Sequence, residues 1–115
     1  MAGYLSTHVL NTAEGVPGAG IAVELWRLEA APVLVARTVT TADGRNRDAF
    51  YPDGEGFVPG LHELRFGMGA YFAGRGGAGA FYEVVPVRVR LEAGQGHYHV
   101  PLLCSPFGYT TYRGS

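Results

Sequence analysis

The 115-residue chain contains very little cysteine and comparatively little charge. Its single cysteine, Cys104, excludes an intrachain disulfide, so an oxidising compartment is not needed to explain a stable fold. Charged residues make up 17% of the chain, against about 25% in a typical soluble domain, and the formal net charge is -1. Bulk charge therefore favours neither nucleic acid nor an anionic membrane as a partner, and a low charged fraction is typical of a surface covered by other copies of the chain.

Long hydrophobic runs and targeting signals are also missing. No apolar run reaches the roughly 20 residues of a transmembrane helix. The first ten residues, MAGYLSTHVL, have neither the basic nor the apolar region of a signal peptide, and the final RGS is not a peroxisomal address. By default we expect a cytoplasmic location and no membrane partner.

What the chain does contain is a regular pattern of short segments separated by 18 glycines and seven prolines. Alternation of apolar and polar residues between frequent turns is typical of an all-β domain. Strands are expected at residues 4–10, 21–28, 33–41, 61–66, 84–91, 97–104 and 108–113. About seven short strands in this length predict a single domain over residues 1–115, folded as a two-sheet β-sandwich. The glycine-rich stretch 68–81 is the only place where a short helix fits.

The segment HYHV near the C-terminus places two histidines two residues apart. Because side chains i and i+2 of a strand share a face, His97 and His99 project together while Tyr98 turns away. Three interpretations stay open at this point: a solvated pair of edge histidines, a zinc site completed by a third ligand, and proton transfer near neutral pH. The motif alone does not choose among them.

His8 and Arg45 are two further candidates whose spacing assigns no role. His8 shares its strand face with Ser6, and a histidine in such a position more often serves structure than catalysis. Arg45 follows the tight-turn signal Asp43-Gly44, where side chains are usually solvated. The alternative for Arg45 is a guanidinium aimed into a cleft, where its planar fork suits carbonyl or anionic oxygens.

Cysteine and serine nucleophiles are disfavoured by the pattern around them. Cys104 lies in an apolar run on the strand face opposite His97 and His99, which predicts a buried core thiol rather than a Cys–His nucleophile. Ser105 and Ser115 lack the G-x-S-x-G pattern of a nucleophile elbow. The glycine-rich GRGGAG segment likewise lacks the spacing of a phosphate-binding loop.

Three segments taken together resemble one family. LSTHVLNTAEGVPGAGIAVEL near the start, TTADGR in the middle and HYHVPLLCSPFGYTTYRGS at the end are similar to the 5-hydroxyisourate hydrolases, the transthyretin-related enzymes of purine breakdown. The terminal YRGS is the most specific of these motifs. Carrier transthyretins share the fold but lack the histidine pair and this ending.

This resemblance implies a transthyretin-like sandwich of seven to eight strands that assembles into a homotetramer as a dimer of dimers, with active sites in the channel between dimers. It implies hydrolysis of the small molecule 5-hydroxyisourate to 2-oxo-4-hydroxy-4-carboxy-5-ureidoimidazoline, without a metal or another cofactor. The catalytic residues carried over by the matching motifs are His8, Arg45 and His99. His8 and Arg45 are also expected to bind the substrate, together with Tyr112 and Ser115.

The chain departs from the family pattern outside these residues. Asn11 stands where aspartate is usual, Cys104 replaces an aliphatic residue, and Thr110 replaces a common serine. The segment 67–80 is unusually rich in glycine. These departures affect the expected loop geometry more than the expected activity. His97 matches the pattern, but the resemblance gives it no clear role.

Three functions other than this hydrolysis remain as alternatives. The first is a transthyretin-like carrier of an aromatic ligand, against which the histidine pair and YRGS argue. The second is a zinc hydrolase that uses His8, His97 and His99 as ligands. The third is a structural sandwich module that binds no ligand and is expected to be a monomer.

Overall fold

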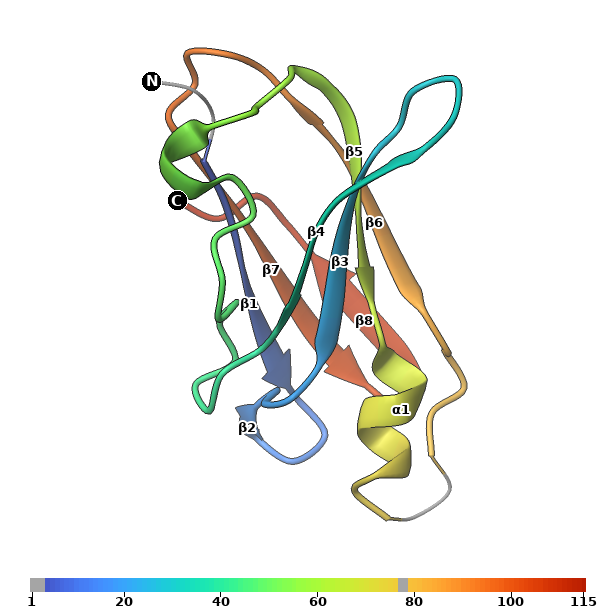
Figure 1. The fold of residues 1–115 in the computed structure, drawn as a ribbon. Coiled ribbons are helices and arrows are strands. Elements are labelled where there is room, and N and C mark those ends of the chain that lie inside the picture. The colour runs from blue at the N-terminus through green and yellow to red at the C-terminus, as the bar shows by residue number, and fades with distance from the viewer. Residues whose placement is uncertain (1–3, 77–78) are drawn as a thin grey trace.

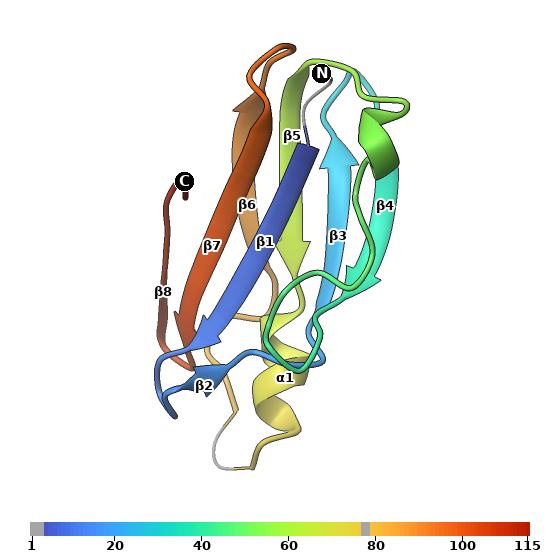
Figure 2. The same cartoon turned by 90° about the vertical axis from the view of Figure 1, so that its left-hand side faces the viewer.

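The computed structural model describes residues 4–76 and 79–115, which form two packed β-sheets (Figure 1). The strands are β1 (Tyr4–Asn11), β2 (Val16–Pro17), β3 (Ala22–Arg27), β4 (Val33–Val39), β5 (Gly60–Phe66), β6 (Val85–Leu91), β7 (His97–Ser105) and β8 (Gly108–Thr111). The first sheet has the order β2-β1-β7-β8 and the second β4-β3-β5-β6, and Figure 2 shows the two layers from the side. The predicted all-β, two-sheet sandwich of seven to eight strands is confirmed.

Strand β2 is the one described strand that the alternation pattern does not predict. It falls in a stretch interpreted as a turn, where the chain doubles back so that Leu10 pairs with Pro17 and Asn11 with Val16. A two-residue ladder is too short to produce a periodic pattern. Strand β6, in contrast, lies at the edge of its sheet, as Pro86 predicts.

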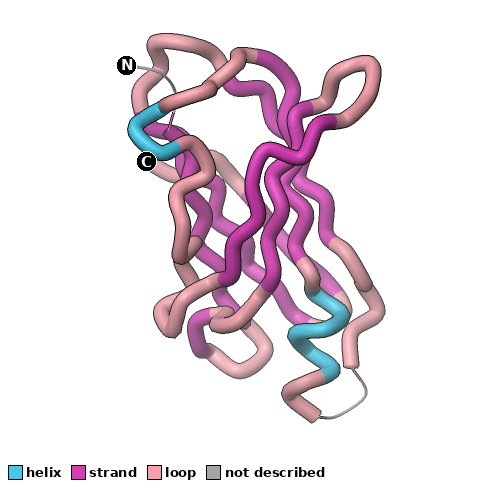
Figure 3. The backbone as a smooth tube through the Cα atoms, in the orientation of Figure 1, coloured by secondary structure: helices cyan, strands magenta, loops and turns pink. Residues whose placement is uncertain are grey.

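In the part of the chain that the structure describes, helical structure is limited to two short segments, shown in cyan in Figure 3. The 3-10 turn η1 (Pro52–Gly54) was not expected from the sequence, whereas α1 (Met68–Ala73) opens the glycine-rich stretch in which a short helix was expected. Helix α1 is held by its buried side chains, which include Tyr71 and Phe72. Residues 77–78 of that stretch lie outside the described residues. Within the described residues, no helix is long and apolar enough to cross a membrane.

The core lies between the sheets and follows the predicted alternation. Completely buried side chains include Val9, Ile21, Val23, Leu25, Leu64, Phe66, Val85 and Leu102. On β1, Leu5 and Val9 are buried while Ser6 and His8 keep partial exposure on the opposite face. Burial of alternate residues fixes the orientation of the strand, because a slip of one residue would expose its apolar side chains. The outer face of the first sheet is therefore left to polar groups.

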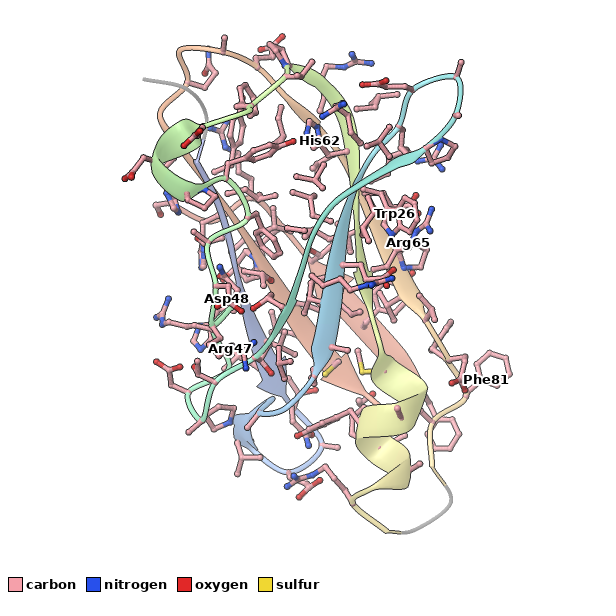
Figure 4. All side chains as sticks on the ribbon, viewed as in Figure 1. Trp26, Arg47, Asp48, His62, Arg65 and Phe81 are labelled. Atoms are coloured by element: carbon pink, nitrogen blue, oxygen red, sulfur yellow. The ribbon has the colours of Figure 1, made fainter. Side chains whose placement is uncertain are left out.

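One histidine belongs to the core. His62 of β5, labelled in Figure 4, is completely buried, with Nε2 2.7 Å from the Tyr51 hydroxyl and Nδ1 3.0 Å from the Gly60 carbonyl oxygen. A carbonyl oxygen only accepts, so Nδ1 carries the proton and Nε2 accepts from Tyr51. Phe57 stacks on the imidazole with an interplanar angle of 7°. Burial lowers the pKa of His62, and the ring is held in its neutral form.

The burial of His62 predicts how stability depends on pH. Its pKa in the fold lies below the value of about 6.5 expected for the unfolded chain, so the unfolded state binds the proton more readily. The free energy of unfolding should therefore be fully present above about pH 6.5 and fall as the pH drops toward the folded pKa. His62→Gln can still accept from Tyr51 but does not titrate, so its loss of stability on acidification should be smaller. Urea unfolding at several pH values checks this, and equal pH dependence in both proteins would contradict it.

Candidate active site

Two of the predicted catalytic residues, His8 and His99, lie on the outer face of the first sheet, where β1 and β7 run parallel. The register sets Ser6 beside His99 and His8 beside Pro101. Successive side chains of a strand alternate between faces, so Ser6 and His8 of β1 share the outward face with His97 and His99 of β7. Segments separated by about four-fifths of the chain thus contribute to one surface.

The turn after β4 brings Arg45 to His8. A backbone bridge pairs the two residues, and the Val9 amide donates to the Gly44 carbonyl oxygen at 2.8 Å. Gly44 has a φ of +86°, and a Cβ there would lie 2.3 Å from the Val9 carbonyl oxygen. Only glycine permits this approach. The tight turn recognised in the sequence therefore serves to place Arg45 next to His8.

A backbone carbonyl fixes the tautomer of His8. Its Nε2 lies 2.8 Å from the carbonyl oxygen of Asp43. Because that oxygen can only accept a hydrogen bond, Nε2 carries the proton. The lone pair of neutral His8 is then on Nδ1, which is the nitrogen able to accept a proton from a reacting group. The sequence pattern gives no sign of this contact with the turn.

Ser6 joins the two histidines of β7. Its hydroxyl oxygen lies 2.7 Å from Nε2 of His97 and 2.8 Å from Nδ1 of His99. A hydroxyl group has one proton to donate and lone pairs with which to accept. Ser6 therefore donates to one imidazole and accepts from the other. Sequence reasoning placed Ser6 on this face but missed this role, because the signal is the register of two distant strands.

The C-terminal tail closes over His99. The amide of Gly114 donates to the His99 carbonyl oxygen at 2.7 Å, and the Thr111 hydroxyl donates to the Pro101 carbonyl oxygen at 2.7 Å. A Cβ on Gly114 would lie 2.6 Å from Cδ2 of the His99 ring. The glycine of the YRGS ending is thus what lets the tail reach this histidine, and Ser115 follows it directly with an exposed side chain.

Tyr112 faces a different hollow in the single chain. Its side chain is 56% exposed and, with Arg113 and residues of β6, lines a groove of about 430 Å³. The Arg113 guanidinium lies 4.5 Å from the centre of the Tyr98 ring on the same side. The structure therefore places His8 beside Arg45 and on the same outward face as His99, whereas Tyr112 lies in the groove next to β6. Substrate binding by Tyr112 and Ser115 stays a prediction.

The surroundings of His99 favour its neutral form. Partial burial lowers the pKa of His99, and electrostatic interactions with Arg45, His97 and His8 lower it further. A neutral imidazole is the form that accepts a proton, so His99 is prepared to act as a base at neutral pH.

A hollow beside β1 offers room for a small molecule. It has a volume of about 350 Å³. Ser6, Arg45, Asn46, Tyr51 and His97 line it in part, whereas His8 and His99 are not among its lining residues. This volume lies at the lower end of the usual range for ligand sites, roughly 300–1,000 Å³. Hydroxyl, guanidinium, amide and imidazole groups on its walls suit a compact ligand rich in carbonyl oxygens.

Cys104 takes no part in this surface. Its side chain is 1% exposed and burial raises the pKa of the thiol to about 11, which confirms the predicted core cysteine. Across residues 4–76 and 79–115, no three His, Cys, Asp or Glu side chains are arranged to hold a metal ion. The zinc interpretation of His8, His97 and His99 thus gains no support from the geometry of these residues.

Sequence relatives match nearly the whole chain. A model described as the HIUase/Transthyretin family matches residues 5–114. The 5-hydroxyisourate hydrolase of Pseudomonas aeruginosa is 46% identical over 117 residues, which cover 98% of this chain and 92% of that protein. The 5-hydroxyisourate hydrolase 2 of Rhizobium meliloti is 48% identical, over 98% of this chain and 97% of that protein.

Solved structures agree with this match. The 5-hydroxyisourate hydrolase of Klebsiella pneumoniae superimposes with a TM-score of 0.83 at 32% identity, over 98% of this chain and 94% of that one. Transthyretin from Sparus aurata superimposes with a TM-score of 0.86 at 29% identity, over 96% of this chain and 95% of that one. The sandwich, its histidine face and these matches lead to one conclusion: the chain belongs to the HIUase/Transthyretin family.

Proposed function

We propose that this chain hydrolyses 5-hydroxyisourate to 2-oxo-4-hydroxy-4-carboxy-5-ureidoimidazoline, a step of urate degradation. The observation that carries the proposal is the outward face shared by β1 and β7, which bears His8 and His99, together with the turn after β4 that sets Arg45 beside His8. Relatives that are 46% and 48% identical over nearly the whole chain bear the name of this activity. A carrier of aromatic ligands has no need of two imidazoles and a guanidinium in one site.

The reaction opens a ring amide with water. Water adds to the amide carbonyl carbon, the carbon–nitrogen bond breaks, and the nitrogen leaves with a proton while the carbon becomes a carboxyl group. Such a step needs a base for the water, a partner for the developing oxyanion and an acid for the leaving nitrogen. Water and the substrate supply all the atoms of the product.

His8 and His99 are proposed to take the proton from water and to return a proton to the nitrogen. His8 offers Nδ1, since its Nε2 proton is held by the Asp43 carbonyl oxygen. His99 offers a ring whose lowered pKa keeps it neutral. Proton acceptors with a pKa near or below the working pH are neutral and ready before the substrate arrives.

Arg45 is proposed to hold the carbonyl oxygens of the substrate and to stabilise their negative charge. Its guanidinium is only loosely engaged, with Nε 3.6 Å from Oδ2 of Asp43 and the side chain 56% exposed. A planar guanidinium can donate two parallel hydrogen bonds to such oxygens. Tyr112 and Ser115 are proposed to hydrogen-bond the rings and fix their pose.

The assembly proposed for the protein is a homotetramer, formed as a dimer of dimers. Large apolar side chains lie open on the single chain: Phe81 is 74% exposed, pointing away from the sandwich in Figure 4, and Phe107 is 73% exposed. Strands β6 and β8 are also sheet edges with unpaired backbone groups. Apolar patches and open edges of this kind are usually covered by partners. A cytoplasmic location is proposed from the sequence alone.

Activity is tested with freshly prepared 5-hydroxyisourate, whose ultraviolet absorbance should disappear faster with the protein than without it. His8→Ala and His99→Ala should each lower kcat by a factor of order 100 or more, because each removes a proton-transfer group. His62→Gln is the matched control, a histidine substitution in the core that should leave kcat nearly unchanged. Wild-type turnover in both alanine variants would refute the site.

Two further results separate this function from its alternatives. Dialysis of the wild-type protein against a chelator should leave the rate unchanged, whereas loss of activity that zinc restores would establish the zinc mechanism. Absence of any acceleration by the wild-type protein would leave the carrier as the better description.

The pH dependence of kcat/KM tests the electrostatic role of Arg45. His99 must be neutral to act, and its pKa lies below the ordinary value of about 6.5, so wild-type activity should fall only at pH values below that ordinary value. Arg45→Met removes a charge that lowers this pKa, so its acid limb should move to higher pH. Arg47→Met is the matched control, because Arg47 pairs with Asp48 at 3.0 Å (Figure 4). Equal acid limbs in all three proteins would contradict the prediction.

Sedimentation equilibrium tests the assembly. The wild-type protein should have about four times the mass of one chain. Phe107→Ser removes a large exposed apolar side chain without touching the core, and it should reduce the mass at equal concentration if that ring lies in an interface. A monomeric wild-type protein at micromolar concentration would rule out the tetramer and favour the structural module.

A further inference from the structure

Three side chains form a continuous hydrogen-bonded line across the outer face of β1 and β7. The line runs from Nδ1 of His99 to the Ser6 hydroxyl at 2.8 Å and from there to Nε2 of His97 at 2.7 Å. His99 is half-buried at one end, whereas His97 is exposed at the other. The line therefore connects the site to solvent.

Only two neutral arrangements satisfy both hydrogen bonds. In the first, Nε2–H of His97 donates to Ser6 and Ser6 donates to Nδ1 of His99, which leaves the His99 proton on Nε2. In the second, Nδ1–H of His99 donates to Ser6 and Ser6 donates to Nε2 of His97. The second arrangement puts the lone pair of His99 on Nε2, the nitrogen that does not contact Ser6. Only this arrangement lets His99 accept a proton from a bound molecule.

We propose that Ser6 and His97 are positioning residues for His99: in the second arrangement they hold the tautomer in which His99 is a base, and they take up the positive charge that it gains. When Nε2 of His99 takes a proton, its Nδ1 proton moves to the Ser6 oxygen and the Ser6 proton moves to Nε2 of His97. His99 returns to neutrality with its proton on Nε2, Ser6 is unchanged, and the positive charge resides on His97. When Nε2 of His99 then gives its proton to the leaving nitrogen, the two protons move back along the line, so His97 becomes neutral again and the starting tautomer of His99 is restored.

The surroundings of His99 explain why moving its positive charge to His97 is useful. The groups that bear on it are His97 on its own strand, His8 on β1 and Arg45 on the turn after β4, and each is cationic or becomes so on protonation. A positive charge that stays on half-buried His99 is disfavoured beside them. On exposed His97 the same charge is solvated by water, so the transfer is downhill.

The catalytic part of this inference rests on the proposed hydrolysis, whereas the tautomer and the coupling of the two histidines do not. Two variants separate proton transfer from mere orientation. Ser6→Ala breaks the line, and His97→Gln still offers Ser6 an amide oxygen or nitrogen but cannot take up a proton. Ser6→Thr retains the hydroxyl and suits a strand, so it serves as the matched rescue variant.

Ser6→Ala and His97→Gln should each lower kcat about tenfold or more with KM nearly unchanged, and Ser6→Thr should restore most of the rate. A purely structural role for His97 predicts wild-type kcat in His97→Gln, and that result would overturn the relay. In mixtures of H2O and D2O, a plot of the wild-type rate against the deuterium fraction should be curved, because more than one proton moves. Ser6→Ala should give a straight line, and curvature that survives in it would also overturn the relay.

Nitrogen-15 NMR of the histidine rings tests the line without any substrate. In the wild-type protein, the nitrogen shifts should show that Nε2 of His97 and Nδ1 of His99 are hydrogen-bonded. The protonation of one ring should also change the shifts of the other. Ser6→Ala should abolish both effects. Unchanged shifts and titration in Ser6→Ala would refute the proposal even if the wild-type protein hydrolyses nothing. Wild-type hydrolysis with full kcat in both Ser6→Ala and His97→Gln would refute the relay and leave the proposed function intact. Circular dichroism verifies that each variant folds. If Ser6→Ala does not fold, the kcat of His97→Gln still tests the relay, because His97 is exposed and its replacement should not disturb the fold.

Discussion

The parallel pairing of β1 with β7 is the interaction on which the rest of the site depends. It joins residues 93 positions apart, Ser6 and His99, and on the core side the Thr7 hydroxyl locks the same register by donating to the Val100 carbonyl oxygen at 2.6 Å. A shift of one residue would turn Ser6 toward the core face and expose Thr7. The buried side of the sheet therefore determines which polar groups meet on its outer side, and core packing and site geometry are set by one contact.

Two glycines complete the site by allowing backbone to approach this strand pair. Gly44 brings the turn to β1 with a φ of +86°, while Gly114 needs no unusual φ and is required because its α-carbon lies against the His99 ring. Each approach is closed by an amide-to-carbonyl hydrogen bond, at 2.8 Å from Val9 to Gly44 and 2.7 Å from Gly114 to His99. Arg45 and the tail thus reach the histidines through main-chain contacts, which hold position better than flexible side chains would.

Sequence reasoning succeeded where a local pattern carries the information. Alternation placed His97 and His99 on one face and Cys104 on the other, as the 1% exposure of Cys104 confirms. Alternation did not predict that His8 lies beside Arg45, because periodicity says nothing about which segments are neighbours. That both belong to the site was implied only by the family resemblance. Ser6 was left without a role for the same reason. Buried His62 shows the converse: the spacing of a histidine does not reveal whether its partners are core groups such as Tyr51.

The departure from the family pattern at Asn11 has a local compensation at the end of β1 beyond the site. Nδ2 of Asn11 donates to Glu14 at 3.0 Å and to the Tyr71 hydroxyl at 3.1 Å, while Oδ1 accepts from the Ala13 and Glu14 amides. Aspartate can accept from those amides but cannot donate to Glu14, whose pKa is lowered to about 2, chiefly by its hydrogen bonds with Arg75. The Asn11 amide thus donates to an ionised Glu14, whereas aspartate would place a second negative charge beside it. Through Tyr71 the same amide links the end of β1 to α1, away from the outward face that carries His8.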